Sequence, residues 1–531
     1  MSNVLVIGGG GREHCIVWKL SRSLRVNKIF CAPGNAGIAS LAECVQIEAD
    51  DVSGVVGFAR ENKIDLVFIA PEIPLELGMA DALEEIGVRA FGPNKAAALI
   101  ESSKVFSKEL MKKYGIPTAK YEFFEDVESA EKYLDLCSLP IVIKAEGLAF
   151  GKGVIIAETS EEAKKAVKDI LEEGLFNEAG RRIVIEEFLT GREFTVLAFT
   201  DGKTISPMVS SQDHKRVFDG NQGKNTGGMG AYAPSPIYSP EVADYCMKHI
   251  YEPTVLALNS EGRKFKGVIY FGLMLTPDGV KVIEYNARFG DPETQVVLPL
   301  LENDLMDVID AVIDERLSEL EIKWKDQACA CIVATSAGYP DSYRKGYEIS
   351  GLAESRHSVQ VGAGAVMADA ADAGIIVANV ANTGAISANA ADAAEAADAG
   401  TIAAGAATAM DIANAANASN VSNASNAANT ANAANTANAA NTANAANTAN
   451  AANTANAANA ANAASVGDAT ELDVIFHSGT GIKDGKYYTA GGRVLGVTAR
   501  RDNLEEAITA AYERIKGVHF EGMHYRKDIG R

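Results

Sequence analysis

The chain has 531 residues and a formal net charge of −21, which leaves room for several domains at about 150 residues each. This acidic balance argues against a broad nucleic-acid or anionic-membrane surface, although local basic clefts for phosphate stay open. The seven cysteines follow no disulfide or zinc spacing, which favours a reducing cytoplasm. We expect neither a signal peptide nor a membrane span, because the first residues lack a basic segment and no apolar run reaches about 18 residues.

Residues 1–103 alternate short apolar strands with helices, the pattern of a Rossmann-like parallel α/β domain. The strand NVLVIG leads into four glycines, Gly8 to Gly11, before a helix expected from about Glu13. Backbone amides at a helix start can hold phosphate, or the glycines can merely form a tight turn. A dinucleotide is disfavoured, because Glu13 stands where the fingerprint needs a third glycine and the second strand ends without a carboxylate.

Pro117 begins a second α/β block that contains a glycine-rich hairpin. In IVIKAEGLAFGKGV (141–154), Lys144 ends a strand and three glycines surround Lys152. The spacing is not that of a Walker A loop, but amides and ammonium groups in such a turn can cover a triphosphate. The alternative is a mobile hairpin with solvated lysines.

Two further segments carry polar groups after apolar strands. In RRIVIEEFLTGREF (181–194), residues 186–189 can read an adenine edge and Glu193 can bind ribose hydroxyls, or the segment is a solvated turn. SQDHKR (211–216) and NTGGMGAY (225–232) form a polar loop pair, in which His214 is either a general base or a satisfied histidine.

VIEYNARFGDPETQ (282–295) begins as a buried strand and then places Glu284, Asn286 and Arg288 at alternate positions, which share one face. That face is either solvated or holds a charged ligand. A carboxylate and an amide oxygen at this spacing suit Mg²⁺, and Arg288 can fork onto a carboxylate or phosphate. With two lysine-bearing loops upstream, the pattern favours the metal.

A C-terminal unit is expected from strands at 328–335 and 493–499 and a helix at 503–516, interrupted by a foreign segment. Residues 363–465 are rich in Ala and Asn, with Asn at every third position from Asn414 to Asn462. A period of three matches neither a helix face nor a strand face. Without large apolar side chains the segment cannot offset its ordering entropy. We predict a disordered insertion; a stacked solenoid is the alternative.

These motifs together resemble the glycinamide ribonucleotide synthetase (phosphoribosylamine–glycine ligase) family of ATP-grasp enzymes. The matching strings occur in the family's order and cover essentially all of the chain outside 363–465: GGREH, PGNAG, IVIKAEGLAFGKGV, SQDHKR, NTGGMGAY, EYNARFGDPE, AGYP and RKDIG. The resemblance implies an α/β fold with an N-terminal domain (1–103), an ATP-grasp domain (104–324, lid about 118–188) and a small α+β C-terminal domain (325–362 and 466–531).

The resemblance also implies a reaction in purine biosynthesis: ATP phosphorylates glycine, and the amine of 5-phosphoribosylamine attacks the glycyl phosphate. It implies Mg²⁺ or Mn²⁺ as cofactor, a cytoplasmic monomer, and no nucleic-acid or membrane partner. For ATP binding it indicates Lys104, Lys144, Gly147, Gly151, Lys152, Gly153, Glu186, Glu187, Phe188 and Glu193. For substrate binding it indicates Gly9, Gly10, Gly11, Arg12, Asn35, Asp213, Lys215 and Arg288. The implied catalytic residues are Arg288, Lys144 and Asp291, and the implied metal ligands are Glu284 and Asn286.

Two residues depart from the family pattern: Glu146 stands where Asp is usual, and Phe150 where the residue is small or aliphatic. Lid closure or nucleotide affinity can differ as a result. One alternative function is that of another ATP-grasp ligase, which would leave SQDHKR and RKDIG unexplained. A second is a catalytically dead scaffold that carries the repeat, against which the intact Lys144, Glu284 and Arg288 argue.

Overall fold

A computed structural model describes residues 1–148, 153–352 and 472–531 of the chain. Gly151, Lys152, Phe150 and the insertion predicted at 363–465 lie outside these residues. The α/β fold class predicted from the sequence is confirmed.

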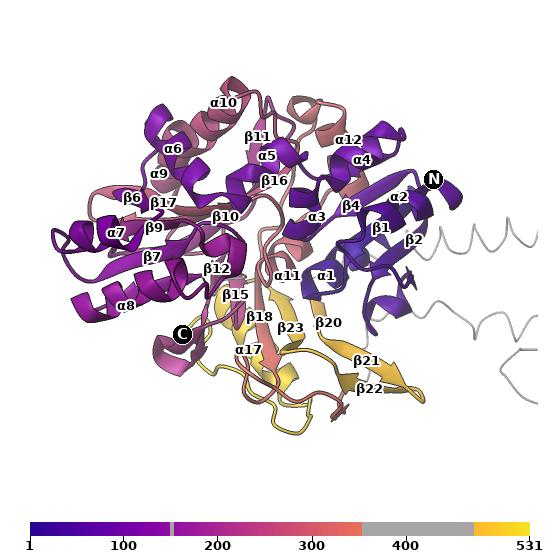
Figure 1. Cartoon of the computed structure of the whole chain (residues 1–531). Coiled ribbons are helices and arrows are strands. Elements are labelled where there is room, and N and C mark those ends of the chain that lie inside the picture. The colour runs from indigo at the N-terminus through magenta and orange to yellow at the C-terminus, as the bar shows by residue number, and fades with distance from the viewer. Residues whose placement is uncertain (149–152, 353–471) are drawn as a thin grey trace, which may run out of the picture. The chain divides into compact units, whose positions relative to one another are not determined.

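The N-terminal region is a five-stranded parallel sheet with the strand order β3-β2-β1-β4-β5. Figure 1 labels β1, β2 and β4 of this sheet, near the N-terminus. Residues Val4 to Ile7 of β1 are completely buried, as expected for a strand covered by helices on both faces. The strands are β1 (Ser2–Gly8), β2 (Val26–Pro33), β3 (Glu43–Cys44), β4 (Leu66–Ile69) and β5 (Arg89–Phe91). The helices are α1 (Gly11–Leu20), α2 (Val52–Glu61), α3 (Glu72–Leu77), α4 (Met79–Glu85) and α5 (Lys95–Ser102).

The central region contains two antiparallel four-stranded sheets, ordered β6-β9-β7-β8 and β11-β10-β16-β17. The first is formed by β6 (Tyr121–Phe124), β7 (Ile141–Ala145), β8 (Val154–Ala157) and β9 (Ile183–Glu187), with α7 (Val127–Leu134) and α8 (Ser160–Leu171). The second is formed by β10 (Arg192–Thr200), β11 (Ile205–Pro207), β16 (Gly267–Thr276) and β17 (Gly279–Asn286). The accompanying helices are α6 (Lys104–Tyr114), α9 (Pro240–Cys246), α10 (Glu252–Ser260), α11 (Thr294–Val297) and α12 (Leu305–Ile313).

An irregularity in the pairing of β16 and β17 decides which way the polar residues of β17 point. Gly272 pairs with Glu284 while the next residue, Leu273, pairs with Val282, so Ile283 is an extra residue on β17. Val282 and Tyr285 are buried, whereas Glu284 and Asn286 lie on the more accessible face. Without this bulge Glu284 would share the buried face of Val282, because side chains alternate along a strand.

The C-terminal region is a five-stranded antiparallel sheet, β12-β15-β18-β23-β20, beside a small sheet β19-β22-β21. Its strands are β12 (Gln212–Asp213), β15 (Gly230–Ala233), β18 (Ala328–Thr335), β20 (Leu472–His477) and β23 (Arg493–Arg501), with β19 (Glu348–Ile349), β21 (Thr480–Lys483) and β22 (Lys486–Thr489) in the small sheet. Helix α17 (Leu504–Ile515) packs on the larger sheet. Because β12 and β15 come from the middle of the chain, this sheet joins two distant stretches of sequence. The predicted domain boundaries stay a prediction.

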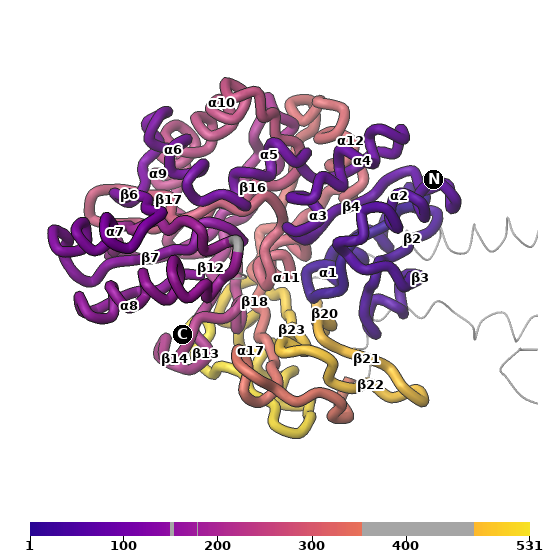
Figure 2. The backbone as a smooth tube through the Cα atoms, in the orientation of Figure 1, coloured from indigo at the N-terminus to yellow at the C-terminus, as the bar shows by residue number. Residues whose placement is uncertain are grey.

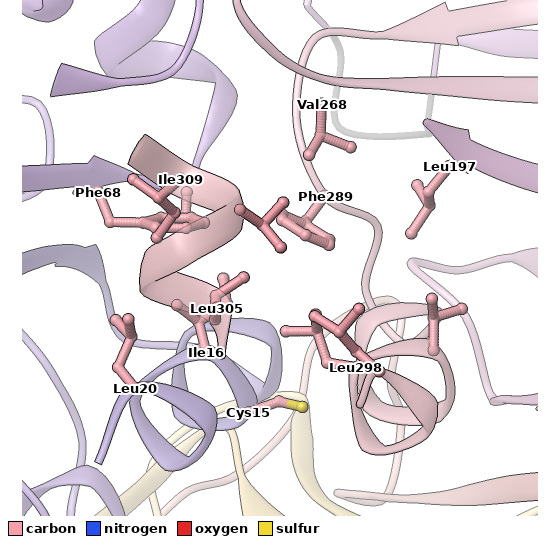
Figure 3. Close-up of a cluster of buried hydrophobic side chains, with 14 of the residues drawn as sticks. Cys15, Ile16, Leu20, Phe68, Leu197, Val268, Phe289, Leu298, Leu305 and Ile309 are labelled. Atoms are coloured by element: carbon pink, nitrogen blue, oxygen red, sulfur yellow. The ribbon is translucent and has the colours of Figure 1, made fainter. Parts of the chain in front are cut away.

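A shared apolar core links these regions. Figure 3 shows residues of α1 (Cys15, Ile16, Leu20), of α12 (Leu305, Ile309) and, near them, Phe68 of β4 and Phe289. All are nearly inaccessible to solvent, and burial of each large apolar side chain contributes about 1.5–3 kcal/mol. Residues 286–300 are therefore packed against the N-terminal region. None of the described helices is both long and apolar enough to cross a membrane.

Candidate active site

Three residues predicted to bind ATP meet where α6, β7 and β9 converge. Lys144 Nζ lies 3.0 Å from the carboxylate of Glu186 and donates to the carbonyl oxygen of Ile283 at 3.3 Å, at the bulge of β17. Lys104, the first residue of α6, donates to the carbonyl oxygen of Gly147 at 3.0 Å. The sequence therefore brings two ammonium groups to the base of the 147–153 loop, of which Gly147, Leu148 and Gly153 are described.

The sequence did not single out Lys108, although it is part of the same cluster. Its Nζ lies 2.9 Å from Glu186 Oε2 and 2.8 Å from Thr118 Oγ1, and the residue is 2% exposed. Burial lowers the pKa of Lys108 to about 8. Burial alone would raise the pKa of Glu186, but Lys144 and Lys108 outweigh it and lower that pKa. The sequence did contain a signal for Lys108: it follows Lys104 by four residues, and residues at this spacing lie on the same face of a helix.

The other predicted nucleotide residues follow β9. Glu187 Oε1 accepts from the backbone amide of Lys120 and from Lys281 Nζ, each at 3.0 Å. Phe188 is 40% exposed, and Glu193 is exposed on β10. Glu146, where the sequence departs from the family, pairs with Arg182 and accepts from Ser103 Oγ at 2.8 Å.

Glu284, one of the two predicted metal ligands, lies beside Lys215 of the QDHK segment (residues 212–215). Lys215 Nζ is 3.6 Å from Glu284 Oε1, and both side chains are about one third exposed, at 34% and 35%. Burial would raise the pKa of Glu284, but Lys215 and Lys144 lower it overall, so the carboxylate stays charged. Burial and the nearby Glu284 raise the pKa of Asp213, against the charge of Lys215.

The guanidinium group of Arg288 binds two carboxylates, and both belong to residues of the N-terminal region. Its Nε lies 3.2 Å from Glu72 Oε2 and its NH2 group 2.9 Å from Glu101 Oε1. The NH2 group also donates to Asn286 Oδ1 at 3.2 Å. Burial raises the pKa of Glu101 to about 7, whereas the charges of Arg288 and Arg12 outweigh burial at Glu72 and lower its pKa to about 2.

The N-terminal glycine loop lies against two other segments, residues 34–35 and 477–478. Asn35 Nδ2 donates to the carbonyl oxygens of Gly9 and of His477, each at 2.8 Å. A Cβ atom at Gly9 would lie 2.4 Å from the carbonyl oxygen of Gly34, and one at Gly11 would lie 2.6 Å from Ser478 Oγ. At Gly9 the obstacle is a backbone atom, so only glycine permits this close approach.

Arg12 and Asp291 connect this loop to residues 286–295. Arg12 pairs with Glu13 at 2.6 Å and donates from NH1 to the carbonyl oxygen of Phe289 at 2.9 Å. A Cβ atom at Gly10 would lie 3.4 Å from Asp291 Oδ2, which itself pairs with Arg493 at 3.1 Å. Residues 289–291 thus contact the predicted substrate-binding loop and closely follow β17, which carries the predicted metal ligands.

His214 is not placed as a general base. It directly follows Asp213, and its ring lies 5.9 Å from that of Tyr232. Burial, together with the charge of Arg526, lowers the pKa of His214 to about 4. A neutral imidazole with a basicity this low is a poor proton acceptor.

Family models match all three regions of the chain. Residues 102–294 match the family described as phosphoribosylglycinamide synthetase, ATP-grasp (A) domain, which defines the class of the central region. Residues 2–101 and 453–531 match the N and C domains of the same synthetase.

Relatives match along the whole chain. A phosphoribosylamine–glycine ligase of Caldanaerobacter subterraneus is 37% identical over 99% of both chains, and one of Halalkalibacterium halodurans is 53% identical over 66% of this chain and 81% of the relative. The crystal structure of the Thermotoga maritima enzyme of that name superimposes with a TM-score of 0.68 at 26% identity, covering 99% of this chain and 100% of the other. The chain belongs to the phosphoribosylamine–glycine ligase family, whose domains are those of phosphoribosylglycinamide synthetase.

Proposed function

We propose that this chain ligates glycine to 5-phosphoribosylamine, forming glycinamide ribonucleotide, ADP and phosphate in purine biosynthesis. The observation that carries the proposal is the match of phosphoribosylamine–glycine ligases along 99% of the chain. ATP phosphorylates the carboxylate of glycine, and the amine then displaces phosphate from the glycyl phosphate. Such chemistry depends on positioning and charge neutralisation rather than on a side-chain nucleophile, which suits a site built of lysines, an arginine and amides.

ATP binds between the two central sheets in this proposal. Lys144 and Lys104 hold the phosphates, with Gly147, Gly151, Lys152 and Gly153 covering them. The stretch Glu186, Glu187 and Phe188 contacts adenine, and Glu193 contacts the ribose. Support comes from the convergence of Lys104, Lys144 and Glu186 at one point of the structure.

Glu284 and Asn286 would hold Mg²⁺ or Mn²⁺. Both offer hard oxygen atoms on one accessible face of β17, and Mg²⁺ needs few protein ligands when phosphate oxygens supply the rest. No group of three or more His, Cys, Asp or Glu side chains with metal-binding geometry occurs among the described residues, so this pair fits a metal shared with phosphate rather than a closed protein site. When bound, the ion neutralises the phosphates of ATP.

Phosphoribosylamine binds the N-terminal loop in this proposal, through Gly9, Gly10, Gly11, Arg12 and Asn35. Orphan amides at the start of α1 favour its phosphate. Arg288 and Lys144 act on the glycyl phosphate with Asp291 nearby, and Asp213 and Lys215 bind substrate. The division at residues 103 and 324, a cytoplasmic location and a monomeric state belong to the same proposal.

The test is ADP release by the purified chain with ATP, Mg²⁺, glycine and freshly generated phosphoribosylamine, each omitted in turn. We expect release that requires all four, with glycinamide ribonucleotide as product. Turnover with a different carboxylic acid, and none with glycine, would instead indicate another ATP-grasp ligase.

A further inference from the structure

Glu293 is a buried carboxylate that the sequence did not single out. It is 3% exposed, and Tyr270 Oη donates to its Oε1 at 3.1 Å. That hydroxyl in turn accepts from Thr195 Oγ1 at 3.1 Å. A charged carboxylate in such a place is costly unless several donors surround it, so this hydroxyl chain only partly stabilises the anion.

Glu293 lies where the two halves of the proposed site meet. Tyr270 pairs across the sheet with Asn286, so one side of the carboxylate adjoins the proposed metal strand. On the other side, Arg12 binds the carbonyl oxygen of Phe289 at 2.9 Å, which brings the substrate loop to the same segment. A Cβ atom at Gly290 would lie 2.4 Å from Glu293 Oε2, so the carboxylate lies directly against the backbone of Gly290.

Charged groups of both signs face Glu293 from the surrounding elements. Asp213 and Lys215 act from the QDHK segment, Arg288 from the end of β17 and Arg493 from β23. Burial, followed by the charge of Asp213, raises the pKa of Glu293 to about 7. A base of this strength changes protonation near neutral pH, where proton transfer is most effective.

We propose that Glu293 accepts the proton released by the amine when that amine attacks the glycyl phosphate. This inference rests on the proposed function and names the base for its second step. The nitrogen lone pair forms the C–N bond, the C–O bond to phosphate breaks and phosphate leaves with that electron pair. One N–H proton passes to Glu293 Oε2, from which solvent or the departing phosphate removes it. No oxidant or further reactant is needed.

Glu293→Gln tests the role, because it keeps the size of the side chain and removes its basicity. The formation of glycinamide ribonucleotide should fall about 10²-fold or more. Phosphorylation of glycine does not need this base. With hydroxylamine, a strong nucleophile, replacing phosphoribosylamine, the variant should therefore form glycine hydroxamate within about threefold of the wild-type rate. Glu302→Gln, an exposed position a short distance along the chain, is the matched control and should change neither product.

The Tyr270→Phe variant gives a second, independent measurement. It removes the hydroxyl that lowers the pKa of Glu293, so the acidic limb of the kcat profile should move to higher pH. Equal loss of both products in Glu293→Gln, or an unshifted profile in Tyr270→Phe, would overturn the role of Glu293. If the wild-type chain itself formed neither product, the proposed function would be wrong, which is a different outcome.

Discussion

Glu186 neutralises two buried lysines, and we expect Glu186→Gln to destabilise the protein. Glu186 is 3% exposed and lies 2.9 Å from Lys108 Nζ and 3.0 Å from Lys144 Nζ. The substitution leaves two ammonium groups facing a neutral amide. Removing one partner of a buried ion pair costs about 3–5 kcal/mol, which in a protein of this size lowers the melting temperature by several degrees.

Lys108→Met should behave in the opposite way. One lysine still pairs with Glu186, and the buried ammonium is gone. The pKa of Lys108 falls from 10.5 to about 8, a shift equivalent to about 3 kcal/mol of destabilisation while the group is charged. We expect the melting temperature at pH 7 to be unchanged or raised.

The contribution of Lys108 to folding stability should change with pH in a defined direction. The unfolded chain binds more protons at Lys108 than the folded chain between pH 8 and 10.5, so this group makes stability rise with pH across that window. Lys19 has a similarly lowered pKa and contributes to the same pH dependence. The part due to Lys108 is therefore obtained by comparing wild type with Lys108→Met in thermal unfolding at several pH values. Similar melting temperatures for Glu186→Gln and Lys108→Met would refute the charge-balance argument.

Three further outcomes follow from the site. Glu284→Gln should reduce turnover by roughly 10²-fold through loss of one preorganised charge, with near-normal stability; undiminished turnover at saturating Mg²⁺ would contradict the metal role. Arg288→Lys cannot fork onto Glu72 and Glu101, and should lose glycine-dependent ADP formation while binding ATP in calorimetry; loss of ATP binding would assign it to the nucleotide instead. Replacing residues 363–465 with a short Gly/Ser linker should leave the kinetic constants and melting temperature nearly unchanged, because the segment offers few large apolar side chains for burial.

Local sequence patterns predicted strands and helices well where the apolar periodicity and the residues at the turns indicate the same boundaries. The strand expected at 328–335 is β18, and the helix expected at 503–516 is α17 at Leu504–Ile515. The bulge at Ile283 was not predicted. It depends on pairing with β16, and nothing in the alternation of β17 alone reveals an extra residue.

The candidate site was predictable only in part for a related reason. Lys144, Glu284 and Arg288 stand in motifs whose neighbouring residues were enough to predict their roles. Glu72 and Glu101, the partners of Arg288, come from α3 and α5, far from it in the sequence. Each is an ordinary helical glutamate until the fold brings it to an arginine, so no local pattern could identify these two partners.

Residues 524–528 show how a distant motif contributes to a site that it does not contact directly. Arg526 is almost completely buried and binds Asp528 at 2.7 Å and the carbonyl oxygen of Arg216 at 3.1 Å. Asp528 also accepts from the backbone amide of Gly220 at 2.8 Å. Figure 2 shows this end of the chain beside β13 (Arg216–Phe218) and β14 (Gln222–Asn225).

That hairpin follows directly after Lys215, whose ammonium group lies 3.6 Å from Glu284. Moving the hairpin would therefore move Lys215 relative to the proposed metal ligand. Arg526 and Asp528 resist such movement, because Arg526 donates to the carbonyl oxygen of Arg216 and Asp528 accepts from the amide of Gly220. Breaking the first bond would leave a buried guanidinium with an unsatisfied donor. The RKDIG and QDHKR segments, separated by about 300 residues, are thus parts of one structural unit, which gives a physical reason for both motifs to occur in the same chain.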